Sequence, residues 1–286
     1  MFTFYYIGFI IIKNTKYINE VRIFLKDEIK KYLPIKDLAN LYVVADFDRT
    51  ITNGSSKTSW SILSESPLVP KEYKKERQEF YNYYRPIEID ESLDYEYKSS
   101  KMKEWYEKHI SLFVKYKITE EIFKNAATDL RIMEFRPGAK EFIKFLYDNN
   151  IPLIIISAGI GNFIETFLHL NNCYYKNIYV SSNKIIFKNG IAVGVDKNII
   201  HSLNKNEVSL PDKIKDKLEN RKKVLLLGDQ ISDLRMVDKD KHDIVYTNCF
   251  LCEENKKELD TIRKEFDIVC ELGDNYFDLK DILFFE

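Results

Sequence analysis

Two aspartates two positions apart, Asp46 and Asp48, directly follow an apolar run from Leu41 to Ala45 in this sequence of 286 residues. In an extended strand, residues two apart point the same way, so the two carboxylates can converge on one point beyond the end of the strand. Carboxylates held together repel each other and lose hydration, which favours a cation or a proton between them. A plain polar turn, in which aspartate is common, is the alternative interpretation.

Two further apolar runs end in the same manner. Residues 151–156 precede Ser157-Ala-Gly159, and residues 224–227 precede Gly228 and Asp229. Continuously apolar strands are typical of parallel sheets covered by helices on both faces, in which ligands bind at the carboxyl ends of the strands. The pattern therefore predicts an α/β fold with a doubly wound parallel sheet. At one edge of that sheet we expect five side chains to meet: Asp46, Asp48, Ser157, Asp229 and Asp233.

Four short motifs resemble those of the haloacid dehalogenase (HAD) superfamily of phosphohydrolases: Asp46-Phe-Asp-Arg-Thr50, Ser157-Ala-Gly159, Lys205 and Gly228-Asp-(x)3-Asp233. Longer blocks are similar to the cytosolic 5'-nucleotidase III family, the pyrimidine 5'-nucleotidases: residues 83–90, 102–106, 157–161, 200–205 and 226–236. The similarity runs from about Leu41 to the end of the chain. It implies a Rossmann-like HAD core, residues 1–52 and 136–286, with a helical cap, residues 53–135, inserted after the first strand.

The resemblance also implies a set of catalytic acids. Asp46 is expected to attack phosphorus and become an aspartyl-phosphate, while Asp48 gives a proton to the leaving oxygen and takes one from water. Mg²⁺ is expected to be bound by the Asp46 carboxylate, the Asp48 main-chain carbonyl and Asp229. Asp233 is expected to hold a metal-bound water or to orient Lys205.

Three further groups are implied to hold the substrate. Ser157 and the Ala158 N–H are expected to bind a phosphoryl oxygen, and Lys205 to balance the charge of the transferring group. Glu88 is implied to recognise the base, since a carboxylate accepts hydrogen bonds from the N–H groups of a base edge. The alternation around Glu88, in residues 87–90, predicts a short extended piece. His109 stands where relatives carry a small hydroxyl residue in the cap.

The predicted cap differs from the core in composition, because charge and aromatic density rise and buried strands disappear. Within it, apolar and aromatic residues recur at three- and four-residue steps from Met102 to Phe113, which predicts one apolar helix face. Such stripes usually pack into a core, but Trp105 and Tyr106 are the better candidates for stacking on a base.

Elsewhere, helical spacing predicts helices over residues 16–38, 139–149 and 161–170. Asn189-Gly190 predicts a hairpin turn.

Composition narrows the class of protein. A formal net charge of −1 argues against a nucleic-acid surface, which needs concentrated basic charge. The four cysteines include Cys249-x-x-Cys252, for which redox or half-metal-site roles are alternatives to incidental thiols. A reducing cytoplasm is the simplest setting. The apolar stretch at residues 1–12 falls short of the roughly 18 to 20 residues that span a bilayer, so we expect no membrane span.

The first hypothesis is therefore Mg²⁺-dependent hydrolysis of nucleoside 5'-monophosphates, small-molecule substrates among which CMP and UMP are expected. The alternative keeps the chemistry but changes the substrate to a sugar phosphate or phosphoserine. A third hypothesis is a signalling receiver module, in which an aspartate at a strand end is phosphorylated. Asp48 and the large cap oppose it, because an extra acid promotes turnover of the phosphorylated aspartate.

Overall fold

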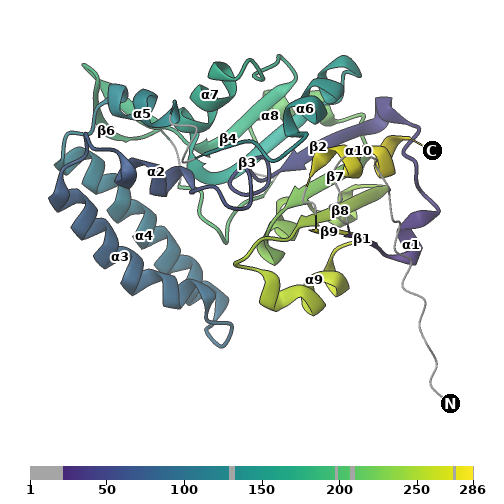
Figure 1. The fold of residues 1–286 in the computed structure, drawn as a ribbon, viewed down its shortest axis with the longest axis horizontal. Helices are drawn as coiled ribbons and strands as arrows, with labels where there is room; N and C mark the ends of the chain where they lie inside the picture. The colour runs from purple at the N-terminus through teal and green to yellow at the C-terminus, as the bar shows by residue number, and fades with distance from the viewer. Residues whose placement is uncertain (1–21, 129–132, 197–198, 207–209, 273–274, 286) are drawn as a thin grey trace.

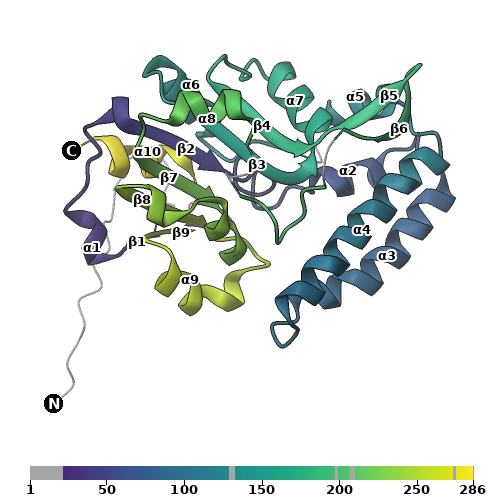
Figure 2. The ribbon, with the colours of Figure 1, turned by 180° about the vertical axis from the view of Figure 1, so that it is seen from behind.

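The computed structural model describes residues 22–128, 133–196, 199–206, 210–272 and 275–285, seen from two sides in Figures 1 and 2. The apolar stretch at residues 1–12 lies outside the described residues. Within the described part of the chain, every helix is too short or too polar to cross a membrane.

The strands form one large sheet, and seven strands contribute to it in the order β1-β9-β8-β7-β2-β3-β4. Their bounds are β1 Arg22–Leu25, β2 Leu41–Ala45, β3 Leu153–Ile160, β4 Ile178–Asn183, β7 Lys223–Gly228, β8 Ile244–Phe250 and β9 Ile268–Leu272. All neighbours are parallel except β1 and β9. Ala45 at the end of β2 pairs with both Ile155 of β3 and Leu227 of β7, so the carboxyl ends of these three strands are level.

Helices cover both faces of this sheet. On one face α6 (Ala139–Asp148), α7 (Gly161–Leu170) and α10 (Tyr276–Phe284) share a core with Val43 and Ala45 of β2. On the other face α8 (Asp212–Leu218) and α9 (Leu259–Glu265) pack against a second core. Alternate side chains of β2 enter opposite cores, which explains why the whole strand is apolar. The predicted doubly wound α/β fold is confirmed, as are the helices near 139–149 and 161–170.

The chain before β2 differs from the prediction. The part of the expected 16–38 helix that is described holds β1, the short helix α1 (Asp27–Lys30) and a single 3-10 turn, η1 (Leu38–Asn40). Ile23 and Leu25 are buried while Phe24 between them is half-buried, a period of two that suits a strand at the sheet edge. Tertiary pairing with β9 has therefore overridden the helical spacing, and β2 is the second strand of the described chain.

Between β2 and α6 the described residues are mainly helical. The helices are α2 (Ser59–Glu65), α3 (Lys71–Ile89), α4 (Tyr95–Lys115) and α5 (Glu120–Ala127). Helices α3 and α4 lie side by side as a long hairpin that projects beyond the sheet (Figure 1). The hairpin β5 (Ile185–Lys188) and β6 (Ile191–Val195) turns at Asn189-Gly190, where both residues have positive φ, which confirms the predicted turn. It packs against α4, so a later segment of the chain supports these helices.

Glu88 lies in a helix and not in an extended piece, so that prediction is wrong. Helix α3 continues through Pro86 to Ile89 and buries Tyr73 and Tyr84 on one side. Ile89 is 60% exposed, so the local alternation has no buried face to follow. An alternation over a single turn is too short to interrupt a helix that is already propagating.

The remaining described helical turns adjoin strands β7 and β8. They are 3-10 helices: η3 (Ile231–Met236) directly after β7, η4 (Lys239–Lys241) before β8 and η5 (Lys256–Glu258) after it.

Candidate active site

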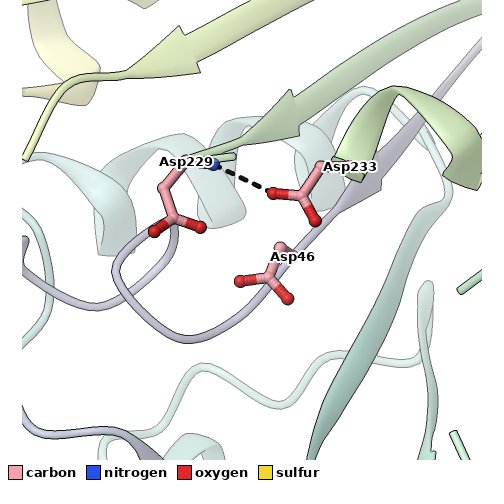
Figure 3. Close-up of side chains that lie close together, drawn as sticks. All are labelled: Asp46, Asp229 and Asp233. Carbon is pink, nitrogen blue, oxygen red and sulfur yellow. Dashed lines mark hydrogen bonds between the residues drawn. The ribbon is translucent and has the colours of Figure 1, made fainter. Parts of the chain in front are cut away.

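Three aspartates meet beyond the carboxyl ends of β2 and β7 (Figure 3). One side-chain oxygen of each of Asp46, Asp229 and Asp233 lies within 4.8 Å of the others, and all three residues are buried. The level register of β2 and β7 places Asp46 and Asp229 next to each other as the strands end. The structure thus brings together residues that are almost two hundred positions apart.

Asp233 is fixed by the backbone of the loop before it. Its Oδ2 accepts hydrogen bonds from the N–H groups of Asp229 and Gln230, each at 3.1 Å. A Cβ on Gly228 would lie 2.6 Å from Asp233, so the close approach of the carboxylate requires glycine at that position. Asp233 is therefore preorganised by the turn that follows β7.

Lys205 links two members of the acid cluster. Its ammonium group donates to Asp46 Oδ1 at 2.6 Å and to Asp233 Oδ1 at 3.0 Å, and the side chain is buried. Burial disfavours the ammonium form, but attraction to Asp233 and Asp46 outweighs it and holds the pKa of Lys205 well above its usual range. Lys205 is thus a charged partner at this site.

One ammonium group does not balance three buried carboxylates. Burial raises the pKa of Asp46 to about 7, against the opposing charge of Lys205. Burial, reinforced by repulsion from Asp233 and Asp46, also raises the pKa of Asp229 well above its usual value. A cluster of oxygen donors with excess negative charge fits a hard metal cation, which would keep all three groups ionised.

Asp48 is held in place by Ser59, the first residue of α2. Ser59 donates to it twice, from its N–H to Oδ1 at 3.0 Å and from its hydroxyl to Oδ2 at 3.1 Å. A Cβ on Gly159 would clash with the Ser59 hydroxyl, so glycine there leaves room for this contact. Burial raises the pKa of Asp48, although the bonds from Ser59 oppose the shift. The carboxyl group is therefore closer to a proton-carrying state than an ordinary aspartate.

Ser157 and Ala158 occupy the end of β3, facing the same cavity. Ser157 is buried, and its hydroxyl accepts a hydrogen bond from the Gly159 N–H at 3.0 Å. Trp60 donates its indole N–H to the Ala158 carbonyl at 2.9 Å, which ties α2 to this strand end. Ser59 and Trp60 were not predicted from the sequence. Thr58 could have pointed to them, because threonine is a common helix N-cap and Thr58 caps the start of α2.

One cavity of about 340 Å³ joins these groups to the α3–α4 hairpin. Its core end includes Asp46, Asp48, Ser157, Lys205 and Asp229; Asp233 is not among the lining residues. Its other wall is formed by side chains of α2, α3 and α4, among them Trp60, Arg77, Tyr81, Arg85, Glu88, Trp105, Tyr106 and His109. The predicted phosphate-binding and base-binding residues therefore share one cavity.

Glu88 is held in place on both carboxylate oxygens. Arg85 donates to Oε2 at 2.5 Å and the Ser202 hydroxyl to Oε1 at 2.7 Å. Arg85 also lies 3.6 Å from Glu254, which pairs with Arg49 at 2.5 Å. This ion-pair chain connects α3 to the loop that carries Asp48.

Arg85, the member of this ion-pair chain that lies on α3, was not predicted because α3 was not expected to continue this far. A helix would have shown Arg77, Tyr81, Arg85 and Glu88 as one stripe. Arg49 and Glu254 come from separate loops, and no sequence spacing connects them.

His109 and Trp105 are buried in the aromatic part of the wall. The His109 ring lies 5.3 Å from the Trp60 ring and 5.8 Å from the Trp105 ring. Within the described chain, neither His109 Nε2 nor Trp105 Nε1 has a hydrogen-bond partner. Burial, with a smaller contribution from the charge of Arg77, lowers the pKa of His109 to about 3. The imidazole is thus neutral at physiological pH.

The cysteines take no part in this arrangement as ligands. Cys173, Cys249, Cys252 and Cys270 are buried. Burial raises the pKa of Cys249 and of Cys252, which favours the unreactive thiol. These observations favour incidental thiols over a redox pair.

Comparison with known proteins identifies relatives of this chain. The family model for pyrimidine 5'-nucleotidase (UMPH-1) matches residues 46–283. The 7-methylguanosine phosphate-specific 5'-nucleotidases of Mus musculus and Homo sapiens are each 35% identical over 205 residues, covering 69% of this chain and 68% of theirs.

Solved structures agree with the sequence matches. Cytosolic 5'-nucleotidase IIIB, crystallised with cytidine, has a TM-score of 0.80 and 26% identity, with 90% of this chain and 91% of that chain covered. A substrate-bound phosphoserine phosphatase complex has a TM-score of 0.54 and 19% identity over 85% of this chain and 98% of that chain, which shows a shared fold. The family match begins at Asp46 and includes both walls of the cavity.

Proposed function

The chain belongs to the pyrimidine 5'-nucleotidase (UMPH-1) family, and from this premise we propose that it is a Mg²⁺-dependent hydrolase of nucleoside 5'-monophosphates, with CMP and UMP as substrates. It is a phosphoric monoester hydrolase with a HAD-like α/β core. One observation carries the proposal: a single cavity has an acid cluster with Lys205 at one end and aromatic side chains with Glu88 at the other.

We assign the metal site to the Asp46 carboxylate, Asp229 and the Asp48 main-chain carbonyl. Oxygen-only donors with excess negative charge suit Mg²⁺, which when bound would neutralise the repulsion between phosphate and carboxylates. The Asp233 carboxylate already accepts from two backbone N–H groups and from Lys205, which supports a positioning role for it.

In the proposed reaction the Asp46 carboxylate attacks phosphorus and forms an aspartyl-phosphate as the bond to the 5'-oxygen breaks. Asp48 supplies the proton that the leaving 5'-oxygen needs. Water then attacks the phosphorylated Asp46, Asp48 takes a proton from that water, and phosphate leaves with the carboxylate restored. The raised pKa of Asp48 supports this acid role, and Ser59 keeps the carboxyl group oriented.

Three groups would stabilise the charge that develops on phosphorus. Lys205 already contacts Asp46, so it lies beside the attacking carboxylate. The Ser157 hydroxyl and the Ala158 N–H would donate to a phosphoryl oxygen from the end of β3. Groups held in place before the reaction stabilise the transition state without reorganisation.

The α3–α4 wall would bind the nucleoside. Trp105 and Tyr106 offer aromatic faces for stacking on a base, and Glu88 offers an acceptor for its N–H groups. A second candidate substrate is 7-methylguanosine 5'-phosphate, for which the mammalian relatives are named. Its cationic base would be attracted to the same aromatic faces.

We place the protein in the cytoplasm. The cytosolic relative of known structure supports this setting.

The test is phosphate release from CMP, UMP, AMP, GMP, 7-methylGMP, a sugar phosphate and phosphoserine, with Mg²⁺ or EDTA, using wild type and Glu88→Ala. We expect Mg²⁺-dependent release from CMP or UMP, with smaller differences between bases in Glu88→Ala. Release from the small esters alone would contradict the nucleotidase assignment. No release, with a long-lived phosphate on Asp46, would instead support the receiver hypothesis.

A further inference from the structure

The α3 wall of the cavity carries the guanidinium group of Arg77, on which Glu65 acts only from beyond ion-pair distance. Arg77 donates from Nη2 to the Ser61 hydroxyl at 3.0 Å, and its Nε is buried without a hydrogen-bond partner in the described chain. Among the described residues, no carboxylate lies within ion-pair distance of it. A buried N–H group without a partner is costly, which marks a position where a ligand acceptor would be favourable.

The other charges on this wall are paired. Arg85 contacts Glu88, and Arg49 contacts Glu254. Lys57, which also lines the cavity, lies 3.9 Å from Glu65, and both side chains are more than half exposed. The end of the cavity near Arg77 is therefore net positive, while the end near Glu88 is close to neutral.

Arg77 lies beside the aromatic part of the wall. Its charge helps to lower the pKa of His109, whose ring lies between those of Trp60 and Trp105. The neutral imidazole of His109 therefore neither adds to the positive charge of Arg77 nor cancels it. Whatever stacks on these aromatic faces is exposed to the positive field of Arg77.

Arg77 and Glu88 mark opposite ends of one helix face. They are eleven positions apart, about three turns and roughly 16 Å along α3, so they cannot contact the same small group. One end of the wall presents an acceptor and the other a cationic donor. A nucleoside lying between them is favoured when its hydrogen-bond donors face Glu88 and its acceptors face Arg77.

We propose that Arg77 is a specificity residue that donates to a carbonyl oxygen of an uncharged nucleobase and discriminates against a cationic base such as 7-methylguanine. The inference deepens the proposed function and rests on it. Arginine donates readily to base carbonyl oxygens. A methylated, positively charged base receives the same stacking but is repelled by the guanidinium, so Arg77 separates the two candidate substrate classes.

The experiment compares kcat/KM for GMP and 7-methylGMP, which differ by one methyl group and its charge. The variants are Arg77→Leu, which removes the charge, and Arg77→Lys, which keeps it. Lys75→Leu is the matched control, because it removes the same charge from an exposed position of the same helix. Thermal unfolding checks that each variant is folded, and Arg77→Gln replaces the leucine variant if that one is not.

We expect Arg77→Leu to raise the 7-methylGMP to GMP ratio by about tenfold, the size of one charge interaction at intermediate dielectric. Arg77→Lys and Lys75→Leu should leave the ratio within about twofold of wild type. A ratio unchanged in Arg77→Leu, or moved equally by Lys75→Leu, would overturn the proposal.

A binding measurement separates this inference from the proposed function. Trp60 and Trp105 flank His109, so quenching of tryptophan fluorescence by guanosine or 7-methylguanosine reports base binding without turnover. Phosphate release from phosphoserine alone would contradict the nucleotidase assignment, whereas the nucleoside affinities of wild type and Arg77→Leu would still decide the role of Arg77. Failure of both nucleosides to bind would contradict it.

Discussion

The two ends of the cavity are built on opposite principles. At the core end, Lys205 pairs with Asp46 and Asp233, and Asp48 accepts two hydrogen bonds from Ser59. At the hairpin end, polar atoms of Arg77, Trp105 and His109 are buried without hydrogen-bond partners in the described chain.

This difference suggests that the core end carries out the reaction and that the hairpin end selects the substrate. A preorganised set of charges stabilises the same transition state for every phosphomonoester that reaches it. Polar groups that find a partner only in a ligand make binding depend on the ligand's own donors and acceptors. Changes at the core end should therefore slow all substrates by one factor, and changes at the hairpin end should alter the ratios between substrates.

The strongest test of the core end is Asp46→Asn. We expect kcat to fall by about 10⁴-fold or more for every nucleotide, because the amide is not a nucleophile. Steady-state phosphate release from CMP, UMP and GMP measures it. A loss confined to one base would break the distinction between the two ends.

Ser157→Ala should have a smaller effect of the same kind. Loss of one preorganised donor is expected to lower kcat by about 10² to 10³-fold, equally across bases. Ser61→Ala provides a matched control at the hairpin end, since it removes a hydroxyl that contacts Arg77. An equal loss of kcat in both variants would show that the hydroxyl at the end of β3 has no special role.

Stability should depend on pH through the core acids. Burial raises the pKa of Asp46 to about 7, whereas an unfolded aspartate titrates near about 3.9. The native state thus holds the extra proton, so this contribution to the free energy of unfolding is present below about pH 4 and lost as the pH rises through about 7. With EDTA present, the stability of wild type relative to Asp46→Asn should fall over this pH range. The change corresponds to at most a few kcal/mol in the free energy of unfolding and is followed as the difference between the two Tm values. A constant or rising difference would contradict the burial argument.

Mg²⁺ should raise the Tm by binding the acid cluster. At a hundredfold excess over Kd, binding stabilises the folded state by about 2.7 kcal/mol. Asp229→Asn should abolish most of this gain, while Asp212→Asn at an exposed position should retain it. An undiminished gain in Asp229→Asn would place the metal elsewhere.

The ion-pair chain between the two ends should give the smallest effect. Glu254→Gln breaks the contacts to Arg49 and Arg85 and loosens the support of Glu88. Because these side chains are partly exposed, the loss is expected to be a two- to fivefold rise in KM at unchanged kcat. A large fall in kcat would show that the chain acts on the chemistry and not on base binding.

Much of the core was predictable because its signals are local. The apolar runs that became β2, β3 and β7 each end in small or acidic residues, and a parallel sheet places such ends at one edge. Asp46, Asp229 and Asp233 were therefore expected to lie together from the sequence alone. The helical spacing of Met102, Trp105 and His109 likewise identified α4.

The failures occurred where long-range contacts outweighed local pattern. Residues 22–25 read as helical, yet pairing with β9 makes them a strand. Residues 87–90 read as extended, yet they continue the helix that begins at Lys71. In both places a short pattern competed with a larger structure, and the larger structure decided the outcome.

By itself, then, the sequence determined the strand ends, the identity of the acids and the family to which the motifs point. Those features depend on spacing along one strand or one helix. Only the tertiary structure decided which groups from separate elements meet: Ser59 with Asp48, Glu254 with Arg85, and Arg77 with Ser61. The physical reason is that such contacts are set by how α2 and the α3–α4 hairpin pack against the rest of the molecule, and that packing arises from burial summed over many residues.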